Sequence, residues 1–426
     1  MEDASLSQAV VNVSRQSAGN GAGNVFVGRH PIFDREKRVY GYQLSFRSSS
    51  SSTYDGPDAD QSTLAVITNS FYVIGFDDLT DGKRAFIHFT QNLLAKDVPA
   101  LLPKDRVTIE VRQSVLGNPE AVSACAALKD LGYELALDDM TPGNFKPAWL
   151  DLADIIKVDF HALPPGQRKA FCQELSGQGL NVLAKKVETT QDFDLAVEAG
   201  CDLFQGYFFS RPEVKSGTRM GGNRFAHMRL LQAVNEASLS YDQLEDVIKQ
   251  DTTMTYNLLR LVNSAWFGYR VKIESVRHAL VLLGQAEIRR WATLVTLKDI
   301  GDSKPPELMV CSMIRARTAE QLAEKLGMPD RRNELFLLGM LSLIDAMTDQ
   351  PMAEVMAKLP ISDDIKDALN GKEGLFRHVL DLTASYERTD WPSFIRSARS
   401  LAIDPADLTQ VIAESIRWSQ KAFSFM

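Results

Sequence analysis

The sequence predicts two folded regions: an N-terminal α/β region, a trimmed (β/α)8-like barrel, followed by an all-α region. Three short apolar runs, ELALDDM (134–140), DIIKVDF (154–160) and GCDLFQGYFFSRP (200–212), carry acidic or amide side chains at or after their ends. Strand-like and helix-like segments alternate up to residue 212, whereas helical periodicity dominates beyond residue 224. Because parallel α/β barrels build polar sites at the carboxyl ends of several strands, the three runs also predict a site on one barrel face.

The expected elements of the first region follow in order along the chain. Residues 1–24 are typical of a flexible tail, and two β-rich runs around DREKR predict a hairpin at 25–47. A helix-like stretch (62–76) precedes the remaining elements. The expected strands are RAFIHFT, RVTIEVR, ELALDD, DIIKVDF, LNVLAKKVE and DLFQGYFFS, and the expected helices are AVSACAALKDLG, GQRKAFCQELSGQG and DFDLAVEAG. The region is shorter than the ~250 residues of a complete barrel, so helices at its rim should be shortened or missing.

The second region is expected to be entirely helical. The segment EVKSGTRMGGNR (213–224) is predicted to link region 25–212 to region 225–426. The stretch NELFLLGMLSLIDAM is apolar around most of its circumference, which indicates a buried central helix. Glycines and prolines, including Gly284, Gly301 and Pro305, mark expected helix breaks.

Composition restricts the class of function. The 426 residues are 45% hydrophobic and 24% charged, which is typical of a globular protein of two or three domains. A formal net charge of -8 gives no electrostatic case for nonspecific nucleic-acid binding. The widely spaced cysteines disfavour a zinc site or a disulfide framework; they are Cys125, Cys172, Cys201 and Cys311. With no apolar stretch long enough to span a bilayer and no secretion signal, a cytoplasmic location is expected.

The motifs resemble, in order, a known pairing of two domains. VGRHPIFDREKRVYGYQLSFR resembles the opening of an EAL domain, and ALDD, IIKVD, VET and GCDLFQGYFFSRP match its core. DTTMTYNLLRLVNSAWFG and SVRHALVLLGQAEIRRW resemble the HDOD signature. Over about residues 25–400 the chain is similar to the YuxH-like EAL–HDOD signalling proteins of bacteria. The resemblance implies a barrel of the type that hydrolyses cyclic di-GMP with two divalent cations, provided that the metal ligands are present.

The resemblance assigns roles to individual positions. The retained positions of the family site are Glu110, Asp138, Asp139, Lys157 and Gln205. Gln43 stands where the family has the glutamate of its Glu-Ala-Leu motif, and His88 stands where it has a metal-binding asparagine. The family loop Glu-Gly-Val-Glu corresponds to Lys185-Lys186-Val187-Glu188, so Lys185 replaces a metal ligand and Glu188 is kept. Gln113 replaces a further acid, and Arg47 matches the arginine that follows the naming motif.

Lys185 is the substitution with the largest electrostatic consequence. At ~4 Å and an effective dielectric constant near 20, one pair of unit charges is worth roughly 4 kcal/mol, so a divalent cation beside Lys185 would be repelled by about twice that. We therefore expect no bound metal, no cofactor and no hydrolysis. We also expect the Lys185 ammonium to occupy the vacated metal position and to pair with Glu110, Asp138 or Asp139.

Three other interpretations stay open at this point. The retained acids can simply cap strand ends by accepting hydrogen bonds from backbone N–H groups. The barrel can be a receptor that binds cyclic di-GMP through Arg47 and Gln205 without hydrolysis. It can also be a weak phosphodiesterase that uses Glu110, Asp138, Asp139 and Glu188 with one metal. The loop DDMTPGN differs from the family's Asp-Asp-Phe-Gly-Thr-Gly, which leaves the dimer-forming loop, and a homo-oligomer, undecided.

The helical region is expected to lack a metal site. HDOD domains resemble HD phosphohydrolases, which need a His-Asp dipeptide, and the sequence has none; His227, His278 and His378 are followed by Met, Ala and Val. Asp345 is expected to bond a helix end or an arginine, and Asn263 to bond a neighbouring turn. Four aromatic residues are expected in the core rather than as partner anchors: Trp266, Phe267, Trp291 and Trp391.

Together these observations predict an inactive EAL barrel joined to a metal-free HDOD domain, acting as a signalling scaffold. By resemblance, the expected partners are regulatory proteins such as diguanylate cyclases, phosphodiesterases, kinases or motility regulators. The expected processes are motility and biofilm control. Cyclic di-GMP itself is the alternative ligand, and neither nucleic acid nor membrane insertion is expected.

Overall fold

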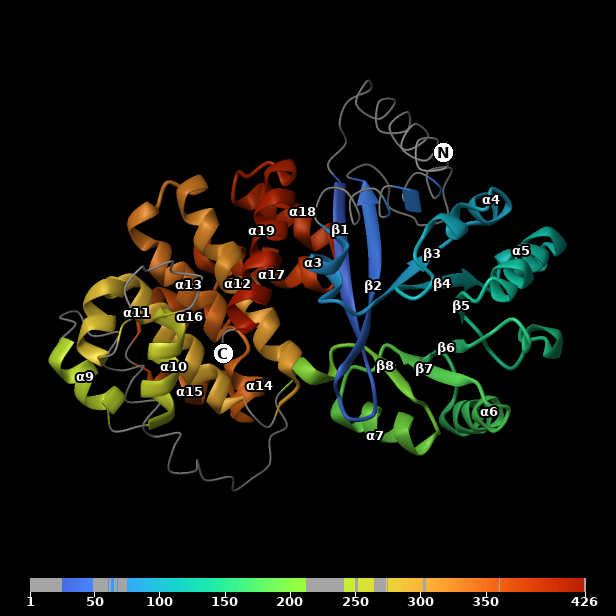
Figure 1. Cartoon of the computed structure of the whole chain (residues 1–426), viewed down its shortest axis with the longest axis horizontal. Helices are drawn as coiled ribbons and strands as arrows, with labels where there is room; N and C mark the ends of the chain where they lie inside the picture. Colours follow the sequence, from blue (N-terminus) through green and yellow to red (C-terminus); the bar gives the residue numbers. More distant parts are fainter. Residues whose placement is uncertain are drawn as a thin grey trace. The chain divides into compact units, whose positions relative to one another are not determined.

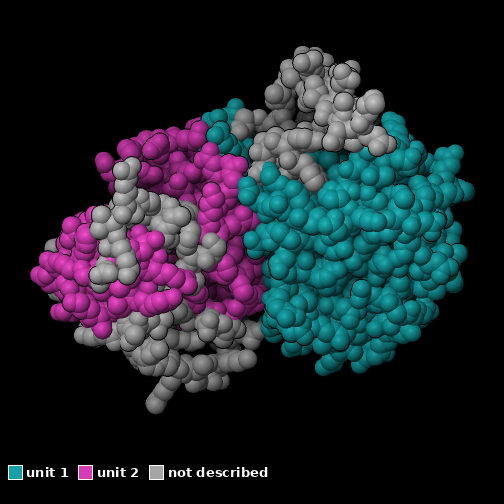
Figure 2. Space-filling view, viewed as in Figure 1, with its two compact units in different colours: residues 1–208, 386–392, 404–413 teal, residues 209–385, 393–403, 414–426 magenta. Residues whose placement is uncertain are grey.

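The computed structural model describes residues 25–48, 60, 63–64, 67, 75–211, 241–249, 252–263, 273, 275–301, 304–359 and 361–424. By its internal contacts the chain forms two compact units, coloured teal and magenta in Figure 2. Unit 1 comprises Met1–Phe208, Tyr386–Pro392 and Asp404–Ala413, and unit 2 comprises Phe209–Ser385, Ser393–Ile403 and Glu414–Met426. The expected tail (1–24) and linker (213–224) lie outside the described residues, so the predicted domain boundaries stay predictions.

Unit 1 contains a closed barrel of eight strands in the order β1 to β8 (Figure 1). Strand β1 pairs antiparallel with both β2 and β8, and all other neighbouring strands pair in parallel. The strands are β1 (Val25–Phe33), β2 (Val39–Ser48), β3 (Arg84–His88), β4 (Val107–Arg112), β5 (Glu134–Asp138), β6 (Ile155–Asp159), β7 (Asn181–Lys185) and β8 (Leu203–Gln205). The predicted hairpin and all six predicted later strands are therefore confirmed.

The reversed first strand follows from the short turn between β1 and β2. Asp34 organises this turn, because its Oδ1 accepts the Arg38 backbone N–H at 2.8 Å and its Oδ2 accepts the Arg38 Nε–H at 2.9 Å. A tight hairpin can connect only antiparallel strands, and it leaves no room for a helix between them. The barrel therefore departs from a regular (β/α)8 pattern at its first strand.

The helices around the barrel are shortened in part, as the length of the region predicts: two have only 5 residues, although two others have 12 and 13. They are α3 (Phe76–Thr80), α4 (Gln91–Ala95), α5 (Pro119–Asp130), α6 (Pro165–Gly177) and α7 (Thr190–Glu198), and they lie outside the strands (Figure 1). Between β5 and β6 the chain forms only a 3-10 turn, Pro147–Trp149. Helix α7 begins with a capping box in which Thr189 and Asp192 satisfy each other's backbone N–H groups.

The barrel interior changes from apolar to polar along the strands. Ile32, Phe86, Ala136, Ile155, Leu183 and Leu203 form one buried cluster. Polar side chains follow at the carboxyl ends of β4 to β8, as the sequence predicts. Immediately after β8, Gly206 has φ 158°, and a Cβ atom there would lie 1.9 Å from the Val187 carbonyl oxygen. Glycine at this position therefore allows the loop after β7 to approach Gln205 closely.

The described part of unit 2 is helical, which confirms the prediction for the second region. Its helices are α9 (Tyr241–Lys249), α10 (Thr252–Val262), α11 (Val276–Ile300), α12 (Pro306–Lys325), α13 (Arg332–Leu341), α14 (Ile344–Thr348), α15 (Met352–Lys358) and α16 (Asp363–Leu369). Parts of α17 (Leu375–Glu387), α18 (Trp391–Ser400) and α19 (Pro405–Ser424) also belong to it. No helix among the described residues is long and apolar enough to cross a membrane.

One expectation for the helices needs correction, and another is confirmed. The stretch NELFLLGMLSLIDAM is buried as predicted, but it forms two helices, α13 and α14, separated at Ser342 and Leu343. The expected break at Gly284 is found, because this residue interrupts α11 with a non-helical conformation, φ 71° and ψ 168°. Glycine adopts this conformation without the steric cost of a side chain, and the chain resumes the helix after it.

Other expectations for the helical region are confirmed where the residues are described. The Asn263 side chain donates to the Ile273 carbonyl oxygen at 2.7 Å and accepts the Ile273 N–H at 2.7 Å, so it is structural. Asp345 accepts the Ala346 N–H at 2.9 Å in the first turn of α14, and burial raises its pKa. Trp291 and Trp391 are buried. Trp266, Phe267 and His227 lie outside the described residues.

Candidate functional site

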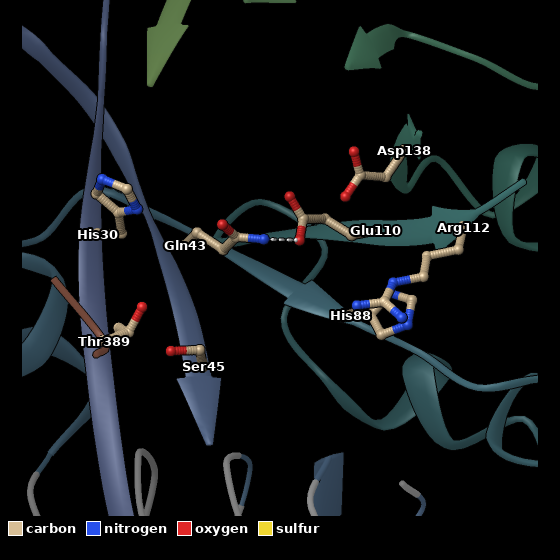
Figure 3. A pocket seen from close by; sticks show the side chains of 8 residues that line it. All are labelled: His30, Gln43, Ser45, His88, Glu110, Arg112, Asp138 and Thr389. Carbon is tan, nitrogen blue, oxygen red and sulfur yellow. Dashed lines mark hydrogen bonds between the residues drawn. The ribbon is translucent and has the colours of Figure 1, made fainter. Parts of the chain in front are cut away.

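Four side chains from alternate strands form a continuous polar layer across the barrel. Gln205 on β8 donates its Nε2–H to Gln43 Oε1 at 2.7 Å. Gln43 on β2 donates its own Nε2–H to Glu110 Oε2 at 2.6 Å, the bond drawn as a dashed line in Figure 3. The other Glu110 oxygen pairs with the Lys157 ammonium on β6, and both side chains are completely buried. Side chains from alternate strands form layers inside α/β barrels, which explains why β2, β4, β6 and β8 contribute here.

Lys185, the last residue of β7, pairs with two carboxylates at the end of β5. Its Nζ is 2.5 Å from Asp138 Oδ1 and 2.7 Å from Asp139 Oδ1. The Asp139 backbone N–H also donates to Asp138 Oδ1 at 2.7 Å. The expected pairing of Lys185 with Asp138 or Asp139 is thus found with both. It does not pair with Glu110, because Lys157 and Gln43 already occupy both oxygens of that carboxylate.

Electrostatics in the cluster favour the charged forms of Asp138 and Lys185. Burial by itself would raise the pKa of Asp138, but Lys157, Lys185 and the hydrogen bonds from Lys185 and Asp139 hold it below its ordinary value. Burial would lower the pKa of Lys185, but Asp138 and Asp139 together raise it. Both groups therefore stay ionised around neutral pH, so the pair is an ion pair and not a neutral hydrogen bond.

Charges in the cluster balance. Glu110, Asp138 and Asp139 contribute three formal negative charges. Lys157, Lys185 and Arg112, whose Nε lies 4.0 Å from Asp139 Oδ2, contribute three positive charges. A site for two divalent cations instead needs a surplus of negative oxygen ligands. Among the described residues, no group of three or more His, Cys, Asp or Glu side chains is arranged to hold a metal ion. The residues present therefore do not fit the pair of cations that the family resemblance implies.

The backbone is strained beside the two ends of this ion pair. Asp139 has φ 58° and Lys186 has φ 60°, in the left-handed region that favours glycine. Lys186 stands at the glycine position of the family loop, and its Nζ pairs with Asp159 Oδ2 at 2.6 Å. Each non-glycine residue in this conformation costs on the order of 1 kcal/mol. Strain of this kind persists only where surrounding contacts fix the chain.

A small polar cavity of about 100 Å³ opens beside the layer (Figure 3). It is lined by His30, Gln43, Ser45, His88, Glu110, Arg112, Asp138 and Thr389. His30 Nε2 and Ser45 Oγ are shielded from solvent and have no hydrogen-bond partner among the described residues. The His30 ring stacks on Tyr207 with a centroid distance of 4.9 Å. Burial and the nearby Lys157 lower the pKa of His30 to about 4, so it is neutral at pH 7.

The remaining site residues that the sequence predicts either do not join the polar layer through their side chains or have side chains outside the described residues. Gln113 contributes only its backbone N–H, which donates to the Asp138 carbonyl oxygen at 3.0 Å. Glu188 is exposed, and its N–H bonds to Asp192 at 3.3 Å near the start of α7. Arg47 pairs with Phe26 through the backbone of the hairpin, but its side chain lies outside the described residues. His88, which stands where the family has a metal-binding asparagine, lines the cavity.

Sequence reasoning missed four residues that line the cavity. His30 could have been found, because it faces Gln43 in the predicted hairpin. Arg112 could also have been found, since it lies two residues beyond Glu110 and therefore on the same face of β4. Ser45 lies two residues beyond Gln43 for the same reason. Thr389 lies far along the chain, and no local pattern connects it to the barrel.

Comparison with known proteins places this geometry in a family. The EAL domain model matches residues 77–212, and the HDOD domain model matches residues 226–357. YuxH of Bacillus subtilis (strain 168) is 33% identical over 402 residues, which cover 92% of this chain and 98% of YuxH. The chain belongs to the YuxH-like EAL–HDOD family.

A second EAL–HDOD relative is CdgJ of Vibrio cholerae, named a cyclic di-GMP phosphodiesterase. It is 32% identical over 401 residues, covering 93% of this chain and 92% of CdgJ. The solved structure of Bacillus subtilis YkuI, in complex with cyclic di-GMP and calcium, is 17% identical, with a TM-score of 0.37 over 54% of this chain and 72% of YkuI. The EAL match begins after β2, so Gln43 lies before the matched range, whereas Glu110, Lys157 and Lys185 lie inside it.

Proposed function

We propose that this EAL–HDOD protein is a signalling scaffold whose barrel does not hydrolyse cyclic di-GMP. The observation that carries this proposal is the position of the Lys185 ammonium, 2.5 Å from Asp138 Oδ1 and 2.7 Å from Asp139 Oδ1. A metal-dependent phosphodiesterase needs these carboxylates to bind its cations. Here the Lys185 ammonium already pairs with both carboxylates.

The layer beneath Lys185 supports the same conclusion. Gln43 presents its NH2 group to Glu110 and uses its amide oxygen to accept from Gln205, so it directs a donor rather than an acceptor at the acid. Glu110 is also paired with buried Lys157. A cation entering the layer would have to displace hydrogen bonds at 2.6 and 2.7 Å as well as a buried ion pair. The polar side chains of this layer therefore already bond to one another and not to a cation.

The order of the two domains does not by itself indicate whether an EAL–HDOD protein hydrolyses cyclic di-GMP, as the relative CdgJ illustrates. CdgJ carries the name of a phosphodiesterase and matches this chain over nearly its whole length. The EAL–HDOD arrangement is therefore compatible with hydrolysis. The proposal rests on Lys185 and Gln43 in this chain.

Turnover of cyclic di-GMP is the decisive measurement. We expect purified full-length protein with Mg²⁺ or Mn²⁺ to form no linear dinucleotide above the rate without protein. We expect the double variant Gln43→Glu/Lys185→Glu to gain Mn²⁺ binding, measured by calorimetry, because it restores two carboxylates to the cluster. The matched control is Gln43→Glu/Lys186→Glu, which adds the same charge one residue away. Wild-type turnover that disappears in Asp138→Ala would contradict the proposal.

A receptor that binds cyclic di-GMP without hydrolysis is tested by calorimetry with the nucleotide. Gln205 already bonds to Gln43, and Asp138 and Asp139 already pair with Lys185, so we expect no binding in the micromolar range. Micromolar binding that is lost in Gln205→Ala or Arg47→Ala would replace the scaffold by a receptor.

As a scaffold, the protein is proposed to act through protein partners in cyclic di-GMP networks. Diguanylate cyclases, phosphodiesterases, kinases and motility regulators are the candidate partners, and motility and biofilm formation are the candidate processes. The test is a binding assay between the purified full-length protein and each candidate from the same organism. A partner that binds the wild type and Asp138→Ala equally well would support a role that needs no barrel chemistry.

A further inference from the structure

Unit 2 contains an arginine cluster around one buried carboxylate, far along the chain from the barrel residues. Glu320 on α12 has a fully buried side chain, with 0% exposure. Three guanidinium groups surround it. They belong to Arg290 on α11, Arg317 on α12 and Arg332, the first residue of α13. We call these four residues the Arg–Glu320 cluster.

Each arginine reaches Glu320 differently. Arg290 Nη2 pairs with Glu320 Oε1, and Arg290 Nη1 is 2.5 Å from Glu287 Oε1. Arg317 Nη1 is 2.7 Å from Glu320 Oε2. Arg332 Nε is 3.5 Å from Glu320 Oε1, too distant to donate a good hydrogen bond. One carboxylate therefore holds three guanidinium groups close together.

The cluster has more positive charge and more donors than its acids can use. Three arginines face two carboxylates, Glu320 and Glu287, which leaves one formal positive charge. The Nε atoms of Arg290, Arg317 and Arg332 are buried, and none has a hydrogen-bond partner among the described residues. The Arg332 side chain is 42% exposed, so the surplus charge is reachable from solvent. Buried donors without partners are costly, and an added acceptor would relieve that cost.

Aromatic rings hold two of the arginines in place. The Arg290 guanidinium lies 5.7 Å from the Phe336 ring centroid, and the Arg317 guanidinium lies 5.8 Å from that of Trp418. Phe336 and Trp418 pack edge to face with a centroid distance of 6.0 Å. Guanidinium groups stack well on aromatic faces, and such fixation reduces the entropy lost when a ligand binds.

We propose that the Arg–Glu320 cluster is an oxyanion-binding site that recognises a phosphate group. Arginine donates several hydrogen bonds in a planar fork, and charge-assisted bonds from guanidinium to phosphate are among the strongest in proteins. A phosphate group offers several acceptor oxygens to the surplus donors of more than one arginine. The site is independent of the barrel and of whether the barrel hydrolyses anything.

Phosphate binding can be followed in the full-length protein through Trp418, because Arg317 lies beside its ring. We expect sodium phosphate, titrated at constant ionic strength against sodium chloride, to change tryptophan fluorescence with a saturable curve. The change should disappear in Trp418→Phe while phosphate still raises the melting temperature. A linear response that chloride reproduces would overturn the proposal, since it would indicate ionic strength alone.

Two variants should change the affinity in opposite directions. Arg332→Gln removes the most exposed positive charge and should weaken phosphate binding about fivefold or more, as expected for roughly 1 kcal/mol. The matched control Arg396→Gln removes an exposed arginine of the same unit outside the cluster and should leave affinity unchanged. Glu320→Gln removes the central negative charge and should tighten binding. Equal affinities of Arg332→Gln and the wild type would overturn the site, even where Glu320→Gln fails to fold.

The same titration identifies the source of the phosphate group. One arm uses inorganic phosphate, and the other compares a short phosphoserine peptide with its unphosphorylated form. Saturation by inorganic phosphate alone assigns a free phosphate, and saturation by the phosphopeptide alone assigns a phosphorylated protein segment. If neither inorganic phosphate nor the phosphopeptide gives a saturable fluorescence change beyond that of chloride, the proposal is overturned.

Discussion

Lys185 and Lys186 are adjacent lysines in very different surroundings. The Lys185 side chain is 15% exposed and lies between Asp138 and Asp139, whereas the Lys186 side chain is 63% exposed and pairs with Asp159. Removing one partner of a buried ion pair leaves an uncompensated charge, but exposed pairs contribute little. We therefore expect Lys185→Met to lower the free energy of unfolding of unit 1 by roughly 2–4 kcal/mol at pH 7.

The neighbouring lysine supplies the matched control for that prediction. Lys186→Met removes the same charge and keeps a side chain of similar length, and it should cost less than about 1 kcal/mol. Urea unfolding of both variants measures the difference. Equal losses would mean that Lys185 is not a structural cation and would weaken the case for an occupied metal position.

His30 should make the stability of unit 1 depend on pH between about 6.5 and 4. Its pKa is lowered from 6.5 to about 4 in the folded state, first by burial and then by Lys157. Between pH 6.5 and 4 the unfolded chain binds a proton on this histidine that the folded protein does not bind. The free energy of unfolding therefore falls as pH falls, and the contribution of His30 levels off below about pH 4. We expect a loss on the order of 2–3 kcal/mol across this interval.

Substitution of the histidine isolates its part of the pH dependence. His30→Gln should flatten the curve of unfolding free energy against pH between 6.5 and 4, and His278→Gln, at an exposed position, should not. Carboxylates that titrate in the same interval affect all three proteins alike. A slope in His30→Gln as steep as that of the wild type would rule out His30 as its source.

Individual site residues could be predicted from the sequence where they lie on strands. Glu110, Lys157 and Gln205 end up in one layer because the register of a parallel barrel fixes which residues face inward. Gln113 and Glu188 lie beyond the ends of β4 and β7, where a loop can turn a side chain away, so their positions did not follow from spacing. The sequence did not indicate how the two lysines divide the acids, with Lys157 pairing with Glu110 and Lys185 pairing with Asp138 and Asp139.

At the scale of elements, one glycine sets how closely two helices of unit 2 approach. A Cβ atom added to Gly339 on α13 would lie 2.3 Å from the Ala316 backbone nitrogen on α12. Backbone atoms cannot move aside as a flexible side chain can, so Gly339→Ala must push the helices apart. Overpacking of this kind typically costs 1–3 kcal/mol, and we expect a loss of roughly 2–3 kcal/mol.

A second glycine of unit 2 provides the control. Gly374 has no atom within 4 Å of the position that a Cβ would occupy, so Gly374→Ala should change the unfolding free energy by less than about 0.5 kcal/mol. Thermal or urea unfolding monitored by circular dichroism measures both variants. A Gly339→Ala protein as stable as the control would mean that α12 and α13 can separate without cost.

Elements with strong periodicity were predictable, and their interruptions were predictable only where a helix-breaking residue marks them. Gly284 marks the interruption inside α11. The apolar stretch 333–347 gives a continuous buried pattern, yet the chain leaves the helix at Ser342 and Leu343, where no glycine or proline signals a break. Local propensity is a weak guide at such a site, because tertiary packing can override it.

At the scale of the whole molecule, the two units are interleaved along the chain. The chain passes from one unit to the other five times, at 208/209, 385/386, 392/393, 403/404 and 413/414. Composition and periodicity predict a single change of character, from α/β to α, near residue 212. The two fold classes are confirmed, whereas the predicted boundary adjoins residues outside the described ranges. Composition and periodicity could not show that Tyr386–Pro392 and Asp404–Ala413 belong by contacts to unit 1, because these segments share the helical pattern of their neighbours.

Interleaving predicts that destabilising unit 2 also loosens one segment of unit 1. The segment Tyr386–Pro392 is joined at both ends to unit 2, and within unit 1 the Tyr207 hydroxyl donates to the Glu387 carbonyl oxygen at 2.8 Å. We expect Gly339→Ala to raise hydrogen exchange of the amides at 386–391, because local opening spreads through the connected chain. Exchange in α5, which has no such connection, should stay at the wild-type rate, and Gly374→Ala should change neither. Unchanged exchange at 386–391 in Gly339→Ala would mean that unit 1 holds this segment independently of the helices on either side of it.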